Sequence, residues 1–245
     1  MADRLEKISL GSKGSGRVVL CLIRKSNRAR RINIRIESSE KIILTLPRWA
    51  SVQAGRAFLF QQRKWLEKRI EKSPPVIDLT THLQTGGQVW LSSHPRALNL
   101  VDLDNMGRYS HEICYDQITL NIPQNSSGTD EQVFSFLQNL AKENLPNRVF
   151  ILSNKFGLEV KKVRVGNQKS RWGSCSSRGT ISLNWRLLLL NYSLGQYVIL
   201  HELAHLKHLN HSLAFWQYLE SICPGARIQD RELRSEGKKI INLGR

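Results

Sequence analysis

The chain has 245 residues, of which 40% are hydrophobic and 23% are charged, so it is long enough to bury one large core or two small ones. Its net charge of +17 indicates attraction to an anionic partner, such as nucleic acid, a membrane surface or an acidic protein. There is no apolar secretory leader and no apolar run long enough to span a membrane, so we expect neither a secreted nor an integral membrane protein. Four widely spaced cysteines predict buried, reduced thiols and a cytoplasmic chain.

The first third of the chain predicts a loose segment, two strands and one helix. Residues 1–16 are polar and rich in Gly and Ser. Residues 31–37 and 41–47 alternate apolar and polar side chains, which is typical of half-buried strands. Ser51 is a candidate N-cap for a helix that continues to Pro74.

The middle of the chain predicts short strands followed by a long helix. Residues 84–122 have the pattern of strands and turns, and the polar stretch 124–132 is the best candidate for an internal boundary. Asp130 is a candidate cap for the next helix. Pro146 inside that helix indicates either two helices or one kinked helix, and Gly157 is its expected end.

Further strands and a terminal helical region follow, so the sequence predicts an α+β fold. We divide it into a loose N-terminal segment (1–16), a β-rich region with one helix (17–125), an α+β domain (130–223) and a basic C-terminal tail (224–245).

The stretch HELAHLKHLNH, residues 201–211, holds four of the seven histidines. A capping box at Ser193 predicts that a helix begins there. On that helix His201 and His205 are related by about 40° of rotation and about 6 Å of rise. Both imidazoles therefore reach one zinc ion at about 2.0–2.1 Å. Glu202 lies beside them, where a general base for a metal-activated water belongs.

A third ligand comes from either His208 or His211. His208 keeps to the same helix face but lies about 4.5 Å beyond His205. His211 is rotated by about 240° on a continuous helix, so it ligates only if the helix breaks first. Asn210 tolerates the conformation that ends helices, and Ser212 is a candidate cap for a new one, which favours His211.

The alternative is a histidine-rich amphipathic helix without metal. The flanking residues are apolar, and burying His201, Glu202 and His205 among them without partners costs several kcal/mol. A bound zinc ion removes that cost, so the pattern favours a zinc site.

Residues 171–216 resemble the core of the YgjP-like zinc metallopeptidases, which are related to the SprT and WLM groups. The resemblance rests on the histidine pattern, on RWGSCS, and on NHSLAFW, and it extends upstream to about residue 24. It implies a zincin-like catalytic domain with an HExxH helix, one zinc ion held by His201, His205 and His211, and Glu202 as the catalytic glutamate.

The motif RWGSC has two interpretations. By the resemblance it precedes an edge strand that binds an extended peptide beside the metal. The alternative is a turn at Gly173 with Trp172 in the core. The candidates for the cleft are Arg171, Trp172, Gly173 and Ser174.

Candidate donors to a transition-state oxyanion are Arg171, His208 and Tyr192. Asn184 and Glu220 are candidates for hydrogen bonds that orient a ligand histidine.

Two basic segments, 24–31 and 161–171, are candidates for nucleic-acid contact or for an ordinary solvated face. Trp49 and Trp65 lie in apolar patterns and are expected in the core rather than as base-stacking aromatics.

The sequence therefore predicts a zinc metallopeptidase acting on protein or peptide substrates, with nucleic acid as a further candidate partner and no membrane association. One alternative is a metal-dependent RNA hydrolase. The other is a non-catalytic zinc module that binds DNA or protein.

Overall fold

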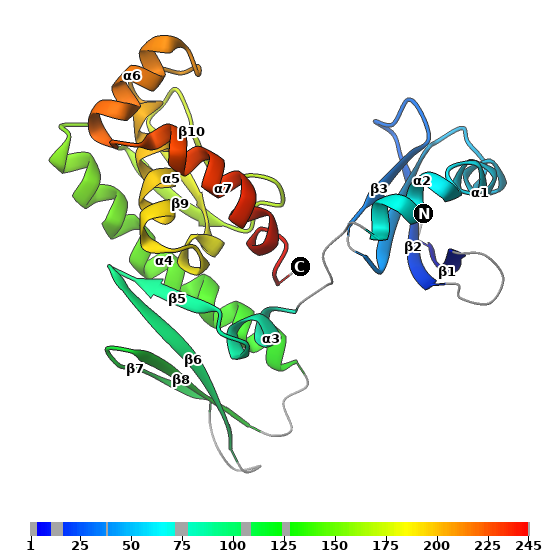
Figure 1. Cartoon of the computed structure of the whole chain (residues 1–245), viewed down its shortest axis with the longest axis horizontal. Coiled ribbons are helices and arrows are strands. Elements are labelled where there is room, and N and C mark those ends of the chain that lie inside the picture. The colour runs from blue at the N-terminus through cyan, green and yellow to red at the C-terminus, as the bar shows by residue number, and fades with distance from the viewer. Residues whose placement is uncertain are drawn as a thin grey trace. The chain divides into compact units, whose positions relative to one another are not determined.

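The computed structural model describes residues 4–10, 17–37, 39–71, 78–103, 109–123 and 128–244. The chain forms two compact units, Met1–Val76 and Ile77–Arg245, which are described separately below (Figure 1). Within the described residues, no helix is both long enough and apolar enough to cross a membrane.

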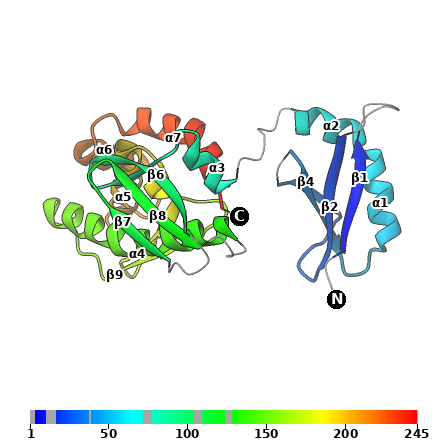
Figure 2. The same cartoon turned by 90° about the horizontal axis from the view of Figure 1, so that it is seen from below.

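The first unit is a four-stranded sheet followed by two helices. Its strands are β1 (Arg4–Leu10), β2 (Arg17–Ser26), β3 (Asn33–Ile36) and β4 (Lys41–Pro47), in the order β1-β2-β4-β3. The pair β2 and β4 is parallel, and the other two pairs are antiparallel. The helices are α1 (Val52–Gln61) and α2 (Arg63–Glu71), and they lie beside the sheet (Figure 2).

Alternation of side chains along β2 and β4 creates the small core of this unit. In each strand every second residue belongs to this core, as Cys21 and Leu44 show, and these side chains cluster with Leu59 of α1 and Leu66 of α2. Gly55 permits the close approach of α1, because a Cβ there would lie 2.7 Å from Leu46 Cδ2.

Two sequence-based expectations for this unit were wrong. Residues 4–10 belong to β1, which pairs with β2 over its whole length, instead of forming a loose segment. The single predicted helix is two helices, because α1 ends at Gln61 and α2 begins at Arg63. The N-cap at Ser51 is confirmed, since its side chain accepts a hydrogen bond from Ala54 N.

The second unit begins with a helix and a second four-stranded sheet. These elements are α3 (Leu79–Gln84), β5 (Gln88–Leu91), β6 (His94–Leu103), β7 (Ser110–Ile113) and β8 (Gln117–Pro123). The strand order is β5-β6-β8-β7, with β6 and β8 parallel.

Helix α4 (Thr129–Lys155) is a single helix with Pro146 inside it. Gly128, in the left-handed region at φ 105°, occupies the N-cap position that the sequence assigned to Asp130. Asp130 instead accepts hydrogen bonds from the Thr80 amide and hydroxyl. Gly157 follows the C-cap with φ 62°, as the sequence predicted.

The remaining elements surround the histidine-rich segment. They are β9 (Lys162–Gly166), β10 (Gly173–Cys175), β11 (Thr180–Asn184), η1 (Trp185–Leu189), α5 (Tyr192–Ala204), α6 (Leu213–Ile222) and α7 (Ala226–Ile240). The three strands form a sheet in the order β10-β11-β9, so β10 is an edge strand. Helix α5 packs against β10, α6 and α7.

The structure groups these residues differently from the sequence-based division. Val89 and Ile118 share one core with Leu145 of α4 and Trp185, so residues 78–123 belong with the histidine-bearing part and not with the first sheet. The expected tail is helix α7. The main chain beyond it is bound by buried Arg186, whose Nε donates to the Leu243 carbonyl at 2.6 Å.

Candidate metal centre

Helix α5 carries the first two histidines of the candidate site at its C-terminal end. It begins two residues earlier than expected, because Asn191 and not Ser193 caps it through a 2.8 Å bond from Leu194 N. Its last turn is buried among apolar residues except where His201 and His205 open toward a cleft.

The helix ends before His211, as ligation by that residue requires. Ala204 is the last residue of α5, and the His208 amide donates to the Ala204 carbonyl at 3.0 Å. The break therefore begins at His205, earlier than the expected Asn210. Ser212 caps α6, as the sequence predicted, and the turn between the two helices brings His211 back beside α5.

The three imidazoles of His201, His205 and His211 face one another. Their ring centroids are 4.8–5.1 Å apart, and one ligand nitrogen from each lies within 4.8 Å of the other two. In the part of the chain that the structure describes, no other group of three His, Cys, Asp or Glu side chains converges in this way. Phe215, fully buried, contacts all three rings at centroid distances of 4.6–5.0 Å and fixes their spacing.

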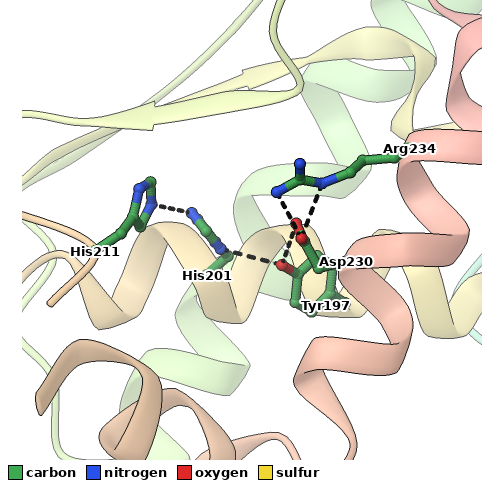
Figure 3. A network of polar contacts seen from close by, with 5 residues as sticks. All are labelled: Tyr197, His201, His211, Asp230 and Arg234. Carbon is green, nitrogen blue, oxygen red and sulfur yellow. Dashed lines mark hydrogen bonds and ion pairs between the residues drawn. The ribbon is translucent and has the colours of Figure 1, made fainter. Parts of the chain in front are cut away.

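Hydrogen bonds determine which nitrogens are free to bind a metal. The Tyr197 hydroxyl donates to Asp230 Oδ1 at 3.2 Å, so its oxygen accepts from His201 Nδ1 at 3.3 Å (Figure 3). Asp230 is in turn paired with Arg234 on α7 at 2.8 Å. His205 Nδ1 donates to the His208 carbonyl at 2.9 Å. Both rings therefore present an unprotonated Nε2 to the space between the histidines.

The residues present fit a divalent metal with imidazole ligands. His201 Nε2 and His211 Nε2 are 2.9 Å apart, and two lone pairs at that distance repel unless a cation or proton lies between them. Burial, together with the neighbouring His205 and His211, lowers the pKa of His201 to about 4, against the opposing effect of Asp230. Burial also lowers the pKa of His205. The neutral imidazoles that result are the form that binds zinc.

Glu202 lies beside the histidines, with its side chain against the backbone of Gly173. A Cβ at Gly173 would be 2.6 Å from both Cγ and Oε1 of Glu202, so a side chain at this position displaces the carboxyl group. Burial raises the pKa of Glu202 to about 7, and the Arg171 guanidinium opposes that shift. Burial, and to a smaller extent the charge of Glu202, raises the pKa of the Cys175 thiol to about 11.

A cleft of about 430 Å³ opens onto this group. One wall is the edge strand β10 with the residues before it, and the opposite wall carries α5 and α7. Four residues predicted for the cleft line it, namely Arg171, Trp172, Gly173 and Ser174. Trp172 is partly buried and also packs against the core and against Gly237 of α7, so it combines a place at the cleft with a place beside the core.

Other candidates from the sequence lie away from the three histidines. The His208 ring packs on Tyr218 at 5.8 Å, and only its carbonyl contacts a site histidine. The Tyr192 ring lies under the Arg148 guanidinium at 4.7 Å and does not line the cleft. Of the three expected oxyanion donors, the structure therefore leaves Arg171 at the cleft.

Asn184 and Glu220 do not bond to a ligand histidine. Asn184 holds the loop before β10, donating to the Arg171 carbonyl at 3.1 Å. Glu220 accepts from Gly225 N at 2.6 Å and from Ala226 N at 3.1 Å, so it caps α7. The residues that orient His201 are Tyr197 and Asp230. The spacing of four residues between Tyr197 and His201 is the signal that would have identified the first of them.

Comparison with known proteins agrees with a metal-dependent hydrolase. The model of the YgjP-like metallopeptidase domain matches residues 30–236, and the chain belongs to this family. The crystal structure of the metallopeptidase zymogen of Pyrococcus abyssi abylysin is 30% identical in sequence. The match covers 37% of this chain and 92% of that chain, with a TM-score of 0.33. No curated protein matches the chain.

The hydrogen bond between Tyr197 and His201 should contribute to metal affinity, so its removal should weaken zinc binding. Tyr197→Phe leaves the Nδ1 hydrogen of His201 without its acceptor, and we expect zinc affinity to fall about 10–100-fold. Competition with a chromophoric chelator measures this directly. Tyr218→Phe on α6 is the matched control, because its ring contacts His208 and not a site imidazole. Equal affinity of the Tyr197→Phe and wild-type chains would contradict this role.

Proposed function

We propose that this chain is a zinc-dependent metallopeptidase in which His201, His205 and His211 hold the metal and Glu202 is the general base. The observation that supports this best is the convergence of three imidazoles beside a buried carboxyl group at the end of an edge strand. An α+β fold containing this arrangement agrees with a zincin-like catalytic unit.

The protein groups have separate roles in peptide hydrolysis. Zinc, when bound, supplies a Lewis acid that polarises a carbonyl and acidifies a water molecule. Glu202 takes the proton from the attacking water on a carboxylate oxygen and delivers it to the leaving amine. Because Gly173 has no side chain, it leaves room for this carboxylate. Arg171 lines the cleft and its charge acts on Glu202, so it is the group proposed to stabilise the developing negative charge.

The edge strand β10 is the element that binds substrate in this proposal. It pairs with β11 on one side, and no described strand pairs with its other edge, which can therefore accept an extended peptide. Such pairing recognises the main chain, which is common to all unfolded proteins, so unfolded polypeptide is the expected substrate class.

The test is hydrolysis of unfolded casein by the full chain, after removal of metal with a chelator and after addition of one equivalent of zinc. Cleavage that depends on zinc supports the proposal. Stoichiometric zinc binding without cleavage of casein contradicts it. RNA is the next substrate in that case, and no hydrolysis of either indicates a binding module.

We expect the variant Gly173→Ala to lose activity while it keeps its metal. The added methyl group displaces the Glu202 carboxylate, and a shift of about 1 Å at a catalytic group costs on the order of 100-fold in rate. Gly166→Ala at the end of β9 is the control, since its Cβ would meet nothing closer than 3.4 Å. Activity near the wild-type level in Gly173→Ala would contradict the assigned position of Glu202.

A further inference from the structure

The positive charge is concentrated in the first unit. Residues 1–76 contain eighteen Lys and Arg against six Asp and Glu, a net charge of +12, whereas the other 169 residues carry +5. The candidate metal centre lies entirely in the second unit. The proposed peptidase activity therefore does not account for most of the charge.

Strand register places a group of these cations at one end of the first sheet. The strands β2 and β4 are parallel, and Ser26 pairs with Pro47 at their ends. The loop 27–32 and the turn 48–50 therefore leave the sheet at the same end. Lys25 Nζ donates to the Arg48 carbonyl at 3.3 Å, which joins the two segments. We call this surface the basic end; its residues, all exposed, are Arg24, Lys25, Arg28, Arg30, Arg31 and Arg48.

The basic end is not neutralised by nearby carboxylates. The sequence has no acidic residue in 7–36 or in 41–66. Glu6 pairs with Arg4 and Arg56. Glu37 pairs with Arg35 and Lys41. Among the residues that the structure describes, no cation of the basic end forms an ion pair, so the anion that complements it comes from outside the unit.

An exposed tryptophan lies within this surface. Trp49 is 78% exposed, although the sequence pattern predicted it in the core. Its neighbours Pro47 and Ala50 are buried, so the turn is anchored while the indole faces solvent. Tryptophan is usually well covered in folded proteins, so this degree of exposure beside six cations indicates a binding role.

We propose that the basic end and Trp49 bind single-stranded nucleic acid. Five of the six cations are arginines, whose planar guanidinium groups bind phosphates through two parallel hydrogen bonds. The indole of Trp49 provides a face on which one unpaired base stacks, which is the mode by which proteins bind single strands without sequence preference. In a duplex the bases are already stacked on one another, so none is available to stack on the indole of Trp49. Binding to an anionic membrane would gain little free energy from insertion of apolar side chains. Trp49 is flanked by charged Arg48 and buried Ala50, so the indole would insert alone.

The test measures binding and requires neither zinc nor catalysis, so it is independent of the proposed peptidase. The full chain is titrated into fluorescein-labelled oligo(dT) or oligo(U) of about 20 nucleotides, with a duplex of equal length and phosphatidylserine vesicles as competitors. The variant Arg28→Ala/Arg30→Ala/Arg31→Ala removes three charges of the basic end. The matched control, Lys161→Ala/Lys162→Ala/Arg164→Ala, removes three exposed charges from the other basic segment. Thermal melting shows whether each variant is folded.

The triple arginine variant should raise the dissociation constant for the single strand about 10–100-fold and reduce the slope of log K against log salt by about 2. Trp49→Ala should raise it about 5-fold or more, and Trp49→Phe, which keeps an aromatic face, by less. Equal losses in the control triple variant, unchanged binding in Trp49→Ala, or preference for duplex or vesicles would each overturn the proposal.

Discussion

Glu202→Gln is expected to abolish peptide hydrolysis while the protein keeps its zinc. Glutamine has nearly the same shape, so it fits the space over Gly173 that the carboxylate occupies. It cannot accept the proton of the attacking water, and the loss of a general base costs about 10²–10⁴-fold in rate. Because Glu202 is not one of the three histidines proposed to bind the metal, the number of zinc ions per chain should not change.

The measurement is kcat/KM on casein or a fluorogenic peptide, with zinc content determined on the same sample. Hydrolysis at the wild-type rate would remove Glu202 from the mechanism and leave the cleft without a base. Loss of zinc in the same variant would instead show that the carboxylate ligates the metal.

The candidate site could be predicted because its information is local. The spacing of His201 and His205 on one helix fixes their relative direction before any tertiary structure is known. The preference for His211 depended on a helix break, and the structure has that break, although it begins at His205. Local pattern thus predicted which side chains converge, and it misplaced the end of the helix by several residues.

The residues that orient the ligands could not be predicted in the same way. Asp230 lies 29 residues beyond His201 in what the composition indicated was a basic tail. Its role depends on the packing of α7 against α5, which no spacing rule gives. The role of Gly173 could not be predicted from local sequence either. It depends on the close approach of β10 to Glu202, which leaves no room for a side chain at this position.

Trp49 and α4 show how tertiary packing overrides local pattern. Trp49 follows an apolar strand and was expected in the core, but the turn at Pro47 directs it outward. Of the two outcomes expected at Pro146, two helices or one kinked helix, the structure has a single helix, α4. Its apolar face packs against a sheet and against η1, and this burial supports the helix across the lost hydrogen bond.

His211→Ala, compared with His208→Ala, is expected to separate the two candidates for the third ligand. The His211 ring lies 4.8–4.9 Å from the rings of His201 and His205. Its removal should weaken zinc binding by at least about 100-fold, since two imidazoles remain where three bound the ion. His211 is exposed, so the change should leave the fold intact, as circular dichroism would show.

His208→Ala keeps the carbonyl that accepts from His205 Nδ1 and removes only a ring that packs on Tyr218. Zinc affinity in this variant should stay within about 3-fold of the wild type, because no ligand atom or orienting hydrogen bond is lost. A large loss in His208→Ala with little change in His211→Ala would reverse the assignment. That result would also imply that the turn between α5 and α6 rearranges when metal binds, since the His208 ring packs on Tyr218 and does not belong to the group of converging histidines.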